Sequence, residues 1–74
     1  MTTKEKLEFI EEALRVKRNT LTEDMELSNL RAWDSLAILN LQVMLSAIKP
    51  NVQFDDLVRC DTVGEICELM EDDN

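Results

Sequence analysis

The chain has 74 residues and a formal net charge of −8, with one glycine and one proline. This length suits one small domain, and the scarcity of turn formers argues against a hairpin-rich sheet. Nucleic-acid binding needs a basic surface, so the charge argues against a nucleic-acid partner, and an anionic membrane would also repel the chain. Residues 1–74 are therefore expected to form a single, mostly helical domain.

A first helix is predicted from about Thr3 to Arg18, because Leu7, Ile10 and Leu14 recur at helical spacing. From residue 19 to residue 33 this periodicity weakens and turn formers gather. The apolar residues that still recur there are Leu21, Met25, Leu27 and Leu30. We expect a long loop that these side chains pin to the core, and loops of such length are often functional.

The second helix is the clearest prediction. Asp34 is suited to cap it, Ser35 is its first residue, and the segment Leu36–Ile48 continues it until Pro50 closes the run. No charged residue occurs between Leu36 and Ile48. A helix that is apolar on most of its surface should be buried on several sides or should face a partner.

Trp33 and Ile38 occupy the positions of a hydrophobic staple on either side of the Asp34 cap. Trp33 has two interpretations. It either packs half-buried on Ile38, or it is an exposed aromatic anchor for a partner protein.

Two shorter helices complete the prediction. One runs from about Phe54 to Arg59, and the last begins at Asp61 or Thr62, where Thr62 and Glu65 have the spacing of a capping box. An inward-facing stripe is expected at Val63, Ile66, Cys67 and Met70. The acidic tail 71–74 is expected to fray, because anions are unfavourable at the carboxyl end of a helix.

Compartment is predicted from the cysteines and from hydropathy. Cys60 and Cys67 lie seven residues apart, in neither a zinc-ribbon nor a CxxC redox spacing, and the chain has no histidine. Reduced, buried thiols are favoured over a disulfide. No apolar run approaches 20 residues, and the first residues lack the apolar core of a signal peptide. A cytoplasmic protein is expected.

Asp34-Ser35-Leu36 carries most of the functional information. A serine in the first turn of a helix lies where backbone N–H groups point outward and the helix dipole favours anions, so a phosphate ester on it would be well placed. Asp34 can help to hold a divalent ion while another enzyme transfers a phosphoryl group, and Leu36 offers an apolar contact. Without a histidine base, Ser35 is not expected to be a catalytic nucleophile. Taken alone, the motif also fits an ordinary helix cap.

Over nearly its full length the chain resembles the acyl carrier protein family. The resemblance includes Asp34-Ser35-Leu36 at the start of the second helix, the long preceding loop that ends at Leu30, the short third helix, and Asp61-Thr62-Val63-Gly64-Glu65-Ile66 at the start of the last helix. It implies an all-α fold, an acyl-carrier-like four-helix bundle with a short third helix and a long loop between helices one and two.

The resemblance further implies a carrier and not an enzyme. A phosphopantetheinyl transferase would attach 4′-phosphopantetheine to Ser35, and Asp34 would support that modification. The cargo, which could be a fatty acyl group, a polyketide intermediate or an amino acid, would ride on the arm as a thioester. Leu36 would contact acyl-loading and acyl-processing enzymes, and Trp33 and Ile38 are predicted as further partner contacts. No metal site within the chain is expected, and a monomer is the default.

Two departures from the family argue against a housekeeping role in fatty-acid synthesis. The second helix lacks the usual acidic residues, and Arg31-Ala32-Trp33 replaces the usual small residues before the motif. We therefore expect a dedicated carrier of a specialised pathway, such as polyketide or other secondary-metabolite biosynthesis, whose partner docks by apolar contact. The alternative is an unmodified helical interaction module on the same scaffold. Met25, Met44 and Met70 either fill the core or line an expandable acyl pocket.

Overall fold

The structure is a computed structural model and describes residues 1–71. Within that range the chain forms four α-helices and one 3₁₀ turn, and no strand. The elements are α1 (Thr3–Leu14), η1 (Leu27–Asn29), α2 (Ser35–Leu45), α3 (Phe54–Val58) and α4 (Val63–Leu69). The prediction of a mostly helical domain with a short third helix and a long first connection is confirmed. Among the described residues, no helix is both long enough and apolar enough to cross a membrane.

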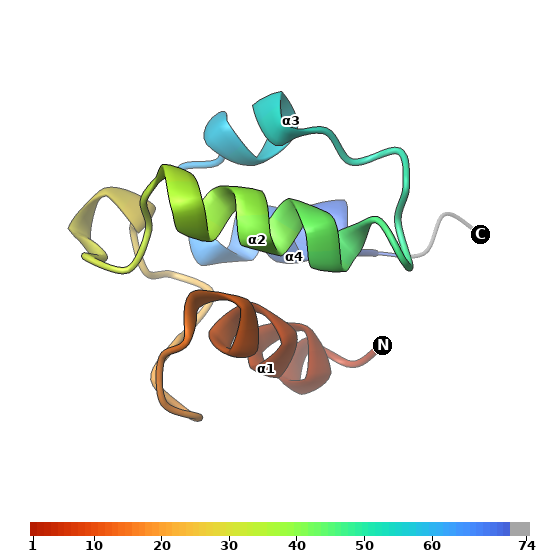
Figure 1. The fold of residues 1–74 in the computed structure, drawn as a ribbon. Coiled ribbons are helices and arrows are strands. Elements are labelled where there is room, and N and C mark those ends of the chain that lie inside the picture. The colour runs from red at the N-terminus through yellow and green to blue at the C-terminus, as the bar shows by residue number, and fades with distance from the viewer. Residues whose placement is uncertain (72–74) are drawn as a thin grey trace.

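Helix α2 lies at the centre of the arrangement (Figure 1). It packs against α1 on one side and against α3 on the other, and α1 also packs against α4. The most completely buried apolar side chains come from all four helices and the loop; they are Ile10, Leu27, Leu41, Leu45, Leu57, Val63 and Ile66. One continuous core therefore fixes the position of α2.

Helix α1 ends at Leu14, short of the predicted end at Arg18. Arg15 adopts the left-handed conformation with φ 60°, and the Val16 N–H donates to the Glu11 carbonyl at 3.0 Å. This bond belongs to the Schellman arrangement, which satisfies a carbonyl of the last turn and turns the chain away from the helix axis. The predicted extension of the first helix to Arg18 was therefore wrong.

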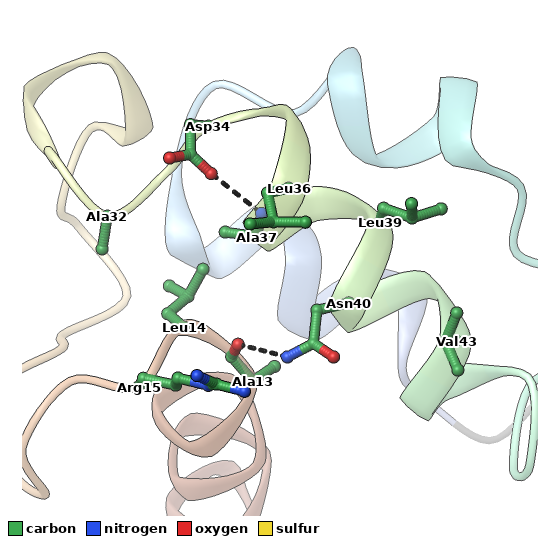
Figure 2. A pocket seen from close by; sticks show the side chains of 10 residues that line it. All are labelled: Ala13, Leu14, Arg15, Ala32, Asp34, Leu36, Ala37, Leu39, Asn40 and Val43. Carbon is green, nitrogen blue, oxygen red and sulfur yellow. Dashed lines mark hydrogen bonds between the residues drawn. The ribbon is translucent and has the colours of Figure 1, made fainter.

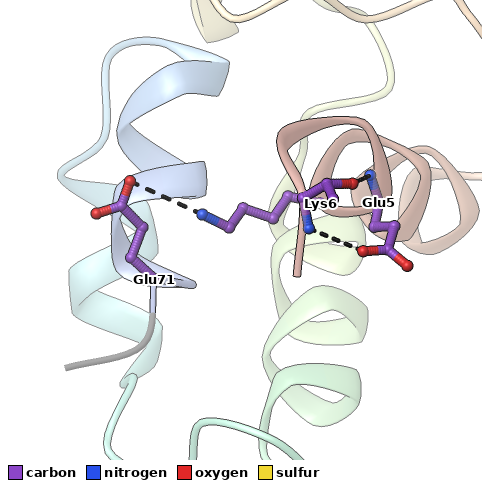
Figure 3. Close-up of polar contacts among 4 residues, drawn as sticks. Glu5, Lys6 and Glu71 are labelled. Atoms are coloured by element: carbon purple, nitrogen blue, oxygen red, sulfur yellow. Dashed lines mark hydrogen bonds and ion pairs between the residues drawn. The ribbon is translucent and has the colours of Figure 1, made fainter. Parts of the chain in front are cut away.

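Polar contacts cap the beginning of α1 and link this helix to the segment after α4 (Figure 3). The Thr2 hydroxyl accepts from the Glu5 N–H, and the Glu5 carboxylate accepts from the Thr2 N–H at 2.8 Å, which forms a capping box. These hydrogen bonds to Thr2 lower the pKa of Glu5. The Lys6 ammonium lies 3.8 Å from the Glu71 carboxylate beyond the end of α4.

The long connection between α1 and α2 is pinned to the core as predicted, because Leu21 and Leu27 are buried. One carboxylate oxygen of Glu11 accepts hydrogen bonds from the Thr20 and Leu21 N–H groups, both at 2.9 Å. A side chain of α1 thus substitutes for the backbone partner that this loop segment lacks.

The same connection also pairs with the beginning of α4. The Val63 N–H donates to the Met25 carbonyl at 3.0 Å, and the Gly64 N–H donates to the Glu23 carbonyl at 2.8 Å. These bonds use orphan N–H groups of the first turn of α4, so the loop and the helix stabilise each other.

Helix α2 ends at Leu45 and not at the predicted Ile48. Residues 46–48 form a turn in which the Ile48 N–H donates to the Leu45 carbonyl at 2.9 Å. Pro50 disfavours helical geometry at Lys49, the residue before it, so no helix can continue past this turn.

The last two helices follow the prediction closely. Helix α3 ends at Val58, one residue before Arg59, and the capping box of Thr62 and Glu65 opens α4. The expected inward stripe on α4 is buried throughout. Of the tail expected to fray, residues 72–74 lie outside the described range.

Candidate functional site

Ser35 is the first residue of α2, and its side chain is exposed. The helix begins there because the Asp34 side chain accepts a hydrogen bond of 2.8 Å from the Ala37 N–H, which confirms the predicted cap. Within residues 1–71 the Ser35 hydroxyl has no hydrogen-bond partner. Its oxygen is therefore open to a reagent that approaches from solvent.

The side of α2 that faces away from the core carries three large apolar side chains. Leu36, Leu39 and Val43 are 76%, 49% and 62% exposed, and their spacing of three and four residues places them on one side of the helix. We call these three residues the α2 outer face. An exposed apolar strip of this kind commonly marks an interaction site. The charge-free helix was expected to be buried on several sides or to face a partner. Only Ile38, Leu41 and Leu45 are buried on it, and contact of the exposed side with a partner stays a prediction.

A groove of about 460 Å³ lies beside the outer face, between the end of α1 and α2 (Figure 2). Ala13, Ala32 and Ala37 all line it, and their small side chains leave the space open. The three residues of the outer face line it as well. The groove and the outer face therefore form one continuous apolar surface that begins next to Ser35.

Asn40 holds the two walls of the groove together. Its side-chain amide donates a hydrogen bond of 2.7 Å to the Ala13 carbonyl in the last turn of α1 (Figure 2). Carbonyls of the last helical turn lack an intrahelical partner, so this bond both caps α1 and sets its position on α2.

Two residues that line the groove carry charge, Arg15 and Asp34. Asp34 is engaged as the helix cap. Arg15 is exposed and follows the last residue of α1, where its positive φ is uncommon for a residue other than glycine. Sequence reasoning missed Arg15, Leu39 and Val43 as site residues. For the two apolar residues the available signal was their spacing from Leu36 within a charge-free helix.

Trp33 and Ile38, the two predicted staple residues, differ in how deeply they are buried. Trp33 is partly buried against the core, which favours the packing interpretation over the exposed anchor. Ile38 is only 7% exposed and belongs to the core, so its prediction as a partner contact is corrected here. In a hydrophobic staple the residue four positions after the cap packs against the residue before the cap, so the side chain of Ile38 points inward and is not available at the surface.

Both cysteines are free, as predicted; Cys67 is buried and Cys60 is half-buried. Burial, supported by the negative charge of Glu65, raises the pKa of Cys60 to about 11. Burial also raises the pKa of Cys67. Since the thiolate is the reactive form, neither side chain is a suitable nucleophile near neutral pH.

The predicted methionines pack on the core. Met70 is buried, and Met25 and Met44 are partly buried against it. None of the three lines the groove beside α2. Within residues 1–71 no cluster of three or more cysteine or acidic side chains has the arrangement of a metal site.

Comparison with known proteins adds no relative. No protein-family model matches the chain, and neither the curated proteins nor the solved structures contain a match.

Proposed function

We propose that this chain is a carrier protein that holds an acyl or related intermediate as a thioester on a 4′-phosphopantetheine arm attached to Ser35. The observation that carries the proposal is the accessibility of the Ser35 hydroxyl. It is exposed, it opens a capped helix, and its hydroxyl has no hydrogen-bond partner within residues 1–71. In this reading the four helices form an acyl-carrier-like bundle, whose short α3 and long first connection support the assignment.

The start of α2 fits a phosphodiester. Unpaired N–H groups and the helix dipole favour an anion there, and a group on the exposed Ser35 oxygen would extend into solvent without displacing core residues. During attachment, the Ser35 oxygen forms the new bond to phosphorus, the phosphoanhydride of coenzyme A breaks, and adenosine bisphosphate leaves. In this proposal the hydroxyl proton passes to a base of the transferase.

Asp34 is exposed beside Ser35, where its carboxylate can assist a magnesium ion that the transferase brings. The attached group supplies a terminal thiol on a long flexible arm. The two cysteines of the chain do not compete with it, because the pKa values of both are raised.

Partner enzymes dock, in this proposal, on the α2 outer face. The absence of charge from Leu36 to Ile48 favours apolar contact and a dedicated carrier in a specialised pathway. Binding of a transferase to the Ser35→Ala variant should then change little between low and high salt. A steep loss of affinity with rising salt would contradict apolar docking.

The decisive experiment is incubation with coenzyme A, magnesium and a broad-specificity phosphopantetheinyl transferase, followed by intact-mass measurement. We expect the mass of one phosphopantetheine group to be added. Ser35→Ala should abolish the addition, whereas Ser28→Ala, at another exposed serine, should leave it unchanged.

The second candidate is an unmodified helical interaction module, which the exposed apolar strip on α2 also favours. It predicts no mass addition under conditions that fully modify a known carrier protein. That result would reject the carrier proposal.

A further inference from the structure

The lining of the groove carries one positive and one negative side chain, Arg15 and Asp34, whereas the whole molecule is acidic. The chain carries −8, which favours encounters with basic proteins. Helix α2 itself has no charged side chain, and the Asp34 carboxylate at its start is engaged with the Ala37 N–H. The cation in the lining is the Arg15 guanidinium, directly after the last residue of α1. A docked partner would therefore meet a cation beside the apolar strip.

Arg15 occupies its position at an energetic cost. Its φ of 60° lies in the left-handed region, where glycine is the least strained residue. Hydrogen bonds of the helix end hold it there, with the Arg15 N–H donating to the Glu12 carbonyl at 3.2 Å. Backbone strain that persists beside a groove is often connected with binding. Arg15 is also one of the residues that line the groove.

The guanidinium is not used within the fold. The ion pair that the structure records in residues 1–71 joins Lys6 to Glu71, on α1 and beyond α4, and none involves Arg15. Arginine presents five donors in a planar fork that matches a carboxylate. Arg15 is thus available to an acceptor from another molecule.

We propose that the groove between α1 and α2 binds an amphipathic helix of a partner protein, with apolar side chains against the α2 outer face and a carboxylate paired with Arg15. This inference rests on the proposed function for the role of α2 as the docking face, and it adds the chemistry of the partner. The partner surface is apolar and locally acidic, opposite to the basic surface that the net charge alone would select.

A second copy of this chain fits the groove less well. Two copies carry −8 each and repel one another, and α2 of the second copy has no carboxylate along its length that could pair with Arg15. A helix from a different protein meets both requirements.

The test uses the full unmodified chain and two synthetic helical peptides with the same leucine strip. One peptide has glutamate and the other lysine at the positions flanking the strip. Binding is followed by amide and methyl chemical shifts. We expect the glutamate peptide to bind about fivefold tighter, the size of one partly exposed charge-assisted pair, with shifts concentrated at Leu36, Leu39 and Val43.

Three variants isolate Arg15. Arg15→Gln should abolish the preference for the glutamate peptide, and so should Arg15→Gly, which relieves the strain and keeps the fold. Arg59→Gln removes the same charge from an exposed position at the end of α3 and should keep the preference.

The inference is overturned if neither peptide binds, if both bind equally, or if the lysine peptide binds more tightly. It is also overturned if the chemical-shift changes are centred away from the α2 outer face. Self-association of the chain through the same residues, seen by sedimentation without peptide, would overturn it in favour of a second copy. Because these measurements need no modification of Ser35, their failure is distinguishable from failure of the mass-addition experiment.

Discussion

At the scale of single residues, Arg15 shows how a sequence can hold strain next to a binding surface. A residue with a Cβ destabilises the fold by about 1–2 kcal/mol when it adopts the left-handed conformation. Replacing it by glycine removes this strain, but glycine loses more conformational entropy on folding, which cancels about 0.5–1 kcal/mol of the gain. We therefore expect Arg15→Gly to raise the free energy of unfolding by about 0.5–1 kcal/mol, measured in urea. Asn19 also has positive φ, at 65°, but asparagine tolerates this region. Asn19→Gly should gain less, and an equal gain would contradict the argument.

Glu11 is a buried acid with a structural task. It is 2% exposed; one oxygen accepts from two loop N–H groups, and the other has no partner in the described structure. Glu11→Ala should cost about 2–3 kcal/mol, because it removes a charged acceptor and leaves the Leu21 N–H buried without one. Glu11→Gln keeps an acceptor and should cost less than about 1 kcal/mol.

Urea unfolding measures both changes, and hydrogen exchange at the Leu21 amide locates them. Glu12→Ala, at the exposed neighbour, is the control and should be nearly neutral. If Glu11→Ala were also neutral, the loop would not depend on this carboxylate.

The thiols give a prediction about pH. With its pKa near 11, Cys60 holds about a hundredth of the thiolate of an ordinary cysteine at pH 8. Its higher intrinsic nucleophilicity restores part of the rate, so alkylation by iodoacetamide should be about tenfold slower than in the urea-unfolded chain. The rate should still rise steeply between pH 10 and 11, where an ordinary thiol has nearly levelled off. Equal rates in the folded and unfolded chains would show that burial does not control this thiol.

At the scale of the helices, the sequence predicted beginnings better than ends. Asp34 and Thr62 cap α2 and α4 as expected, because a cap depends on two or three neighbouring residues. The ends of α1 and α2 came earlier than predicted. Ile48 keeps a helical spacing from Leu45 although α2 has already ended, and residues 15–18 contain no glycine or proline that would mark the end of α1 at Leu14.

The candidate site was predictable only in part, for the same reason. Ser35, Asp34 and Leu36 are adjacent in sequence, so their motif and its place at a helix start were visible. The groove depends on Ala13, Ala32 and Ala37, which come together only when α1 packs on α2. No local pattern marks three alanines as the lining of one surface.

Gly64 tests how tightly the first connection is joined to α4. A Cβ at this position would lie 3.0 Å from the Glu23 carbonyl oxygen, which accepts from the Gly64 N–H. Backbone held by that bond cannot retreat easily, so the clash should exceed the helix propensity gained by alanine. Gly64→Ala should lower the free energy of unfolding by about 1 kcal/mol in urea. Glu68→Ala, on the exposed side of α4, is the control and should not lower the free energy of unfolding. If Gly64→Ala were more stable than the unmodified chain, the loop would be able to adapt to the added methyl group.

At the scale of the whole molecule, the dominant electrostatic feature is self-repulsion. The chain has sixteen acidic and eight basic residues. Within residues 1–71 the recorded ion pair joins Lys6 to Glu71, at 3.8 Å. Net charge of this size opposes the compact state, whereas docking on the charge-free α2 does not depend on it. Salt should therefore act strongly on folding and weakly on apolar docking.

The fold itself is expected to become more stable as salt is added. Screening at about 0.5 M NaCl shortens the Debye length to a few ångströms and should add about 1 kcal/mol, which raises the melting temperature by about 4–8 °C for a domain of this size. Replacing the acids on the outer side of α1, by Glu8→Gln with Glu12→Gln, removes two negative charges and should reduce this response. A melting temperature that falls with salt in the unmodified chain would mean that attractive pairs, and not repulsion, dominate.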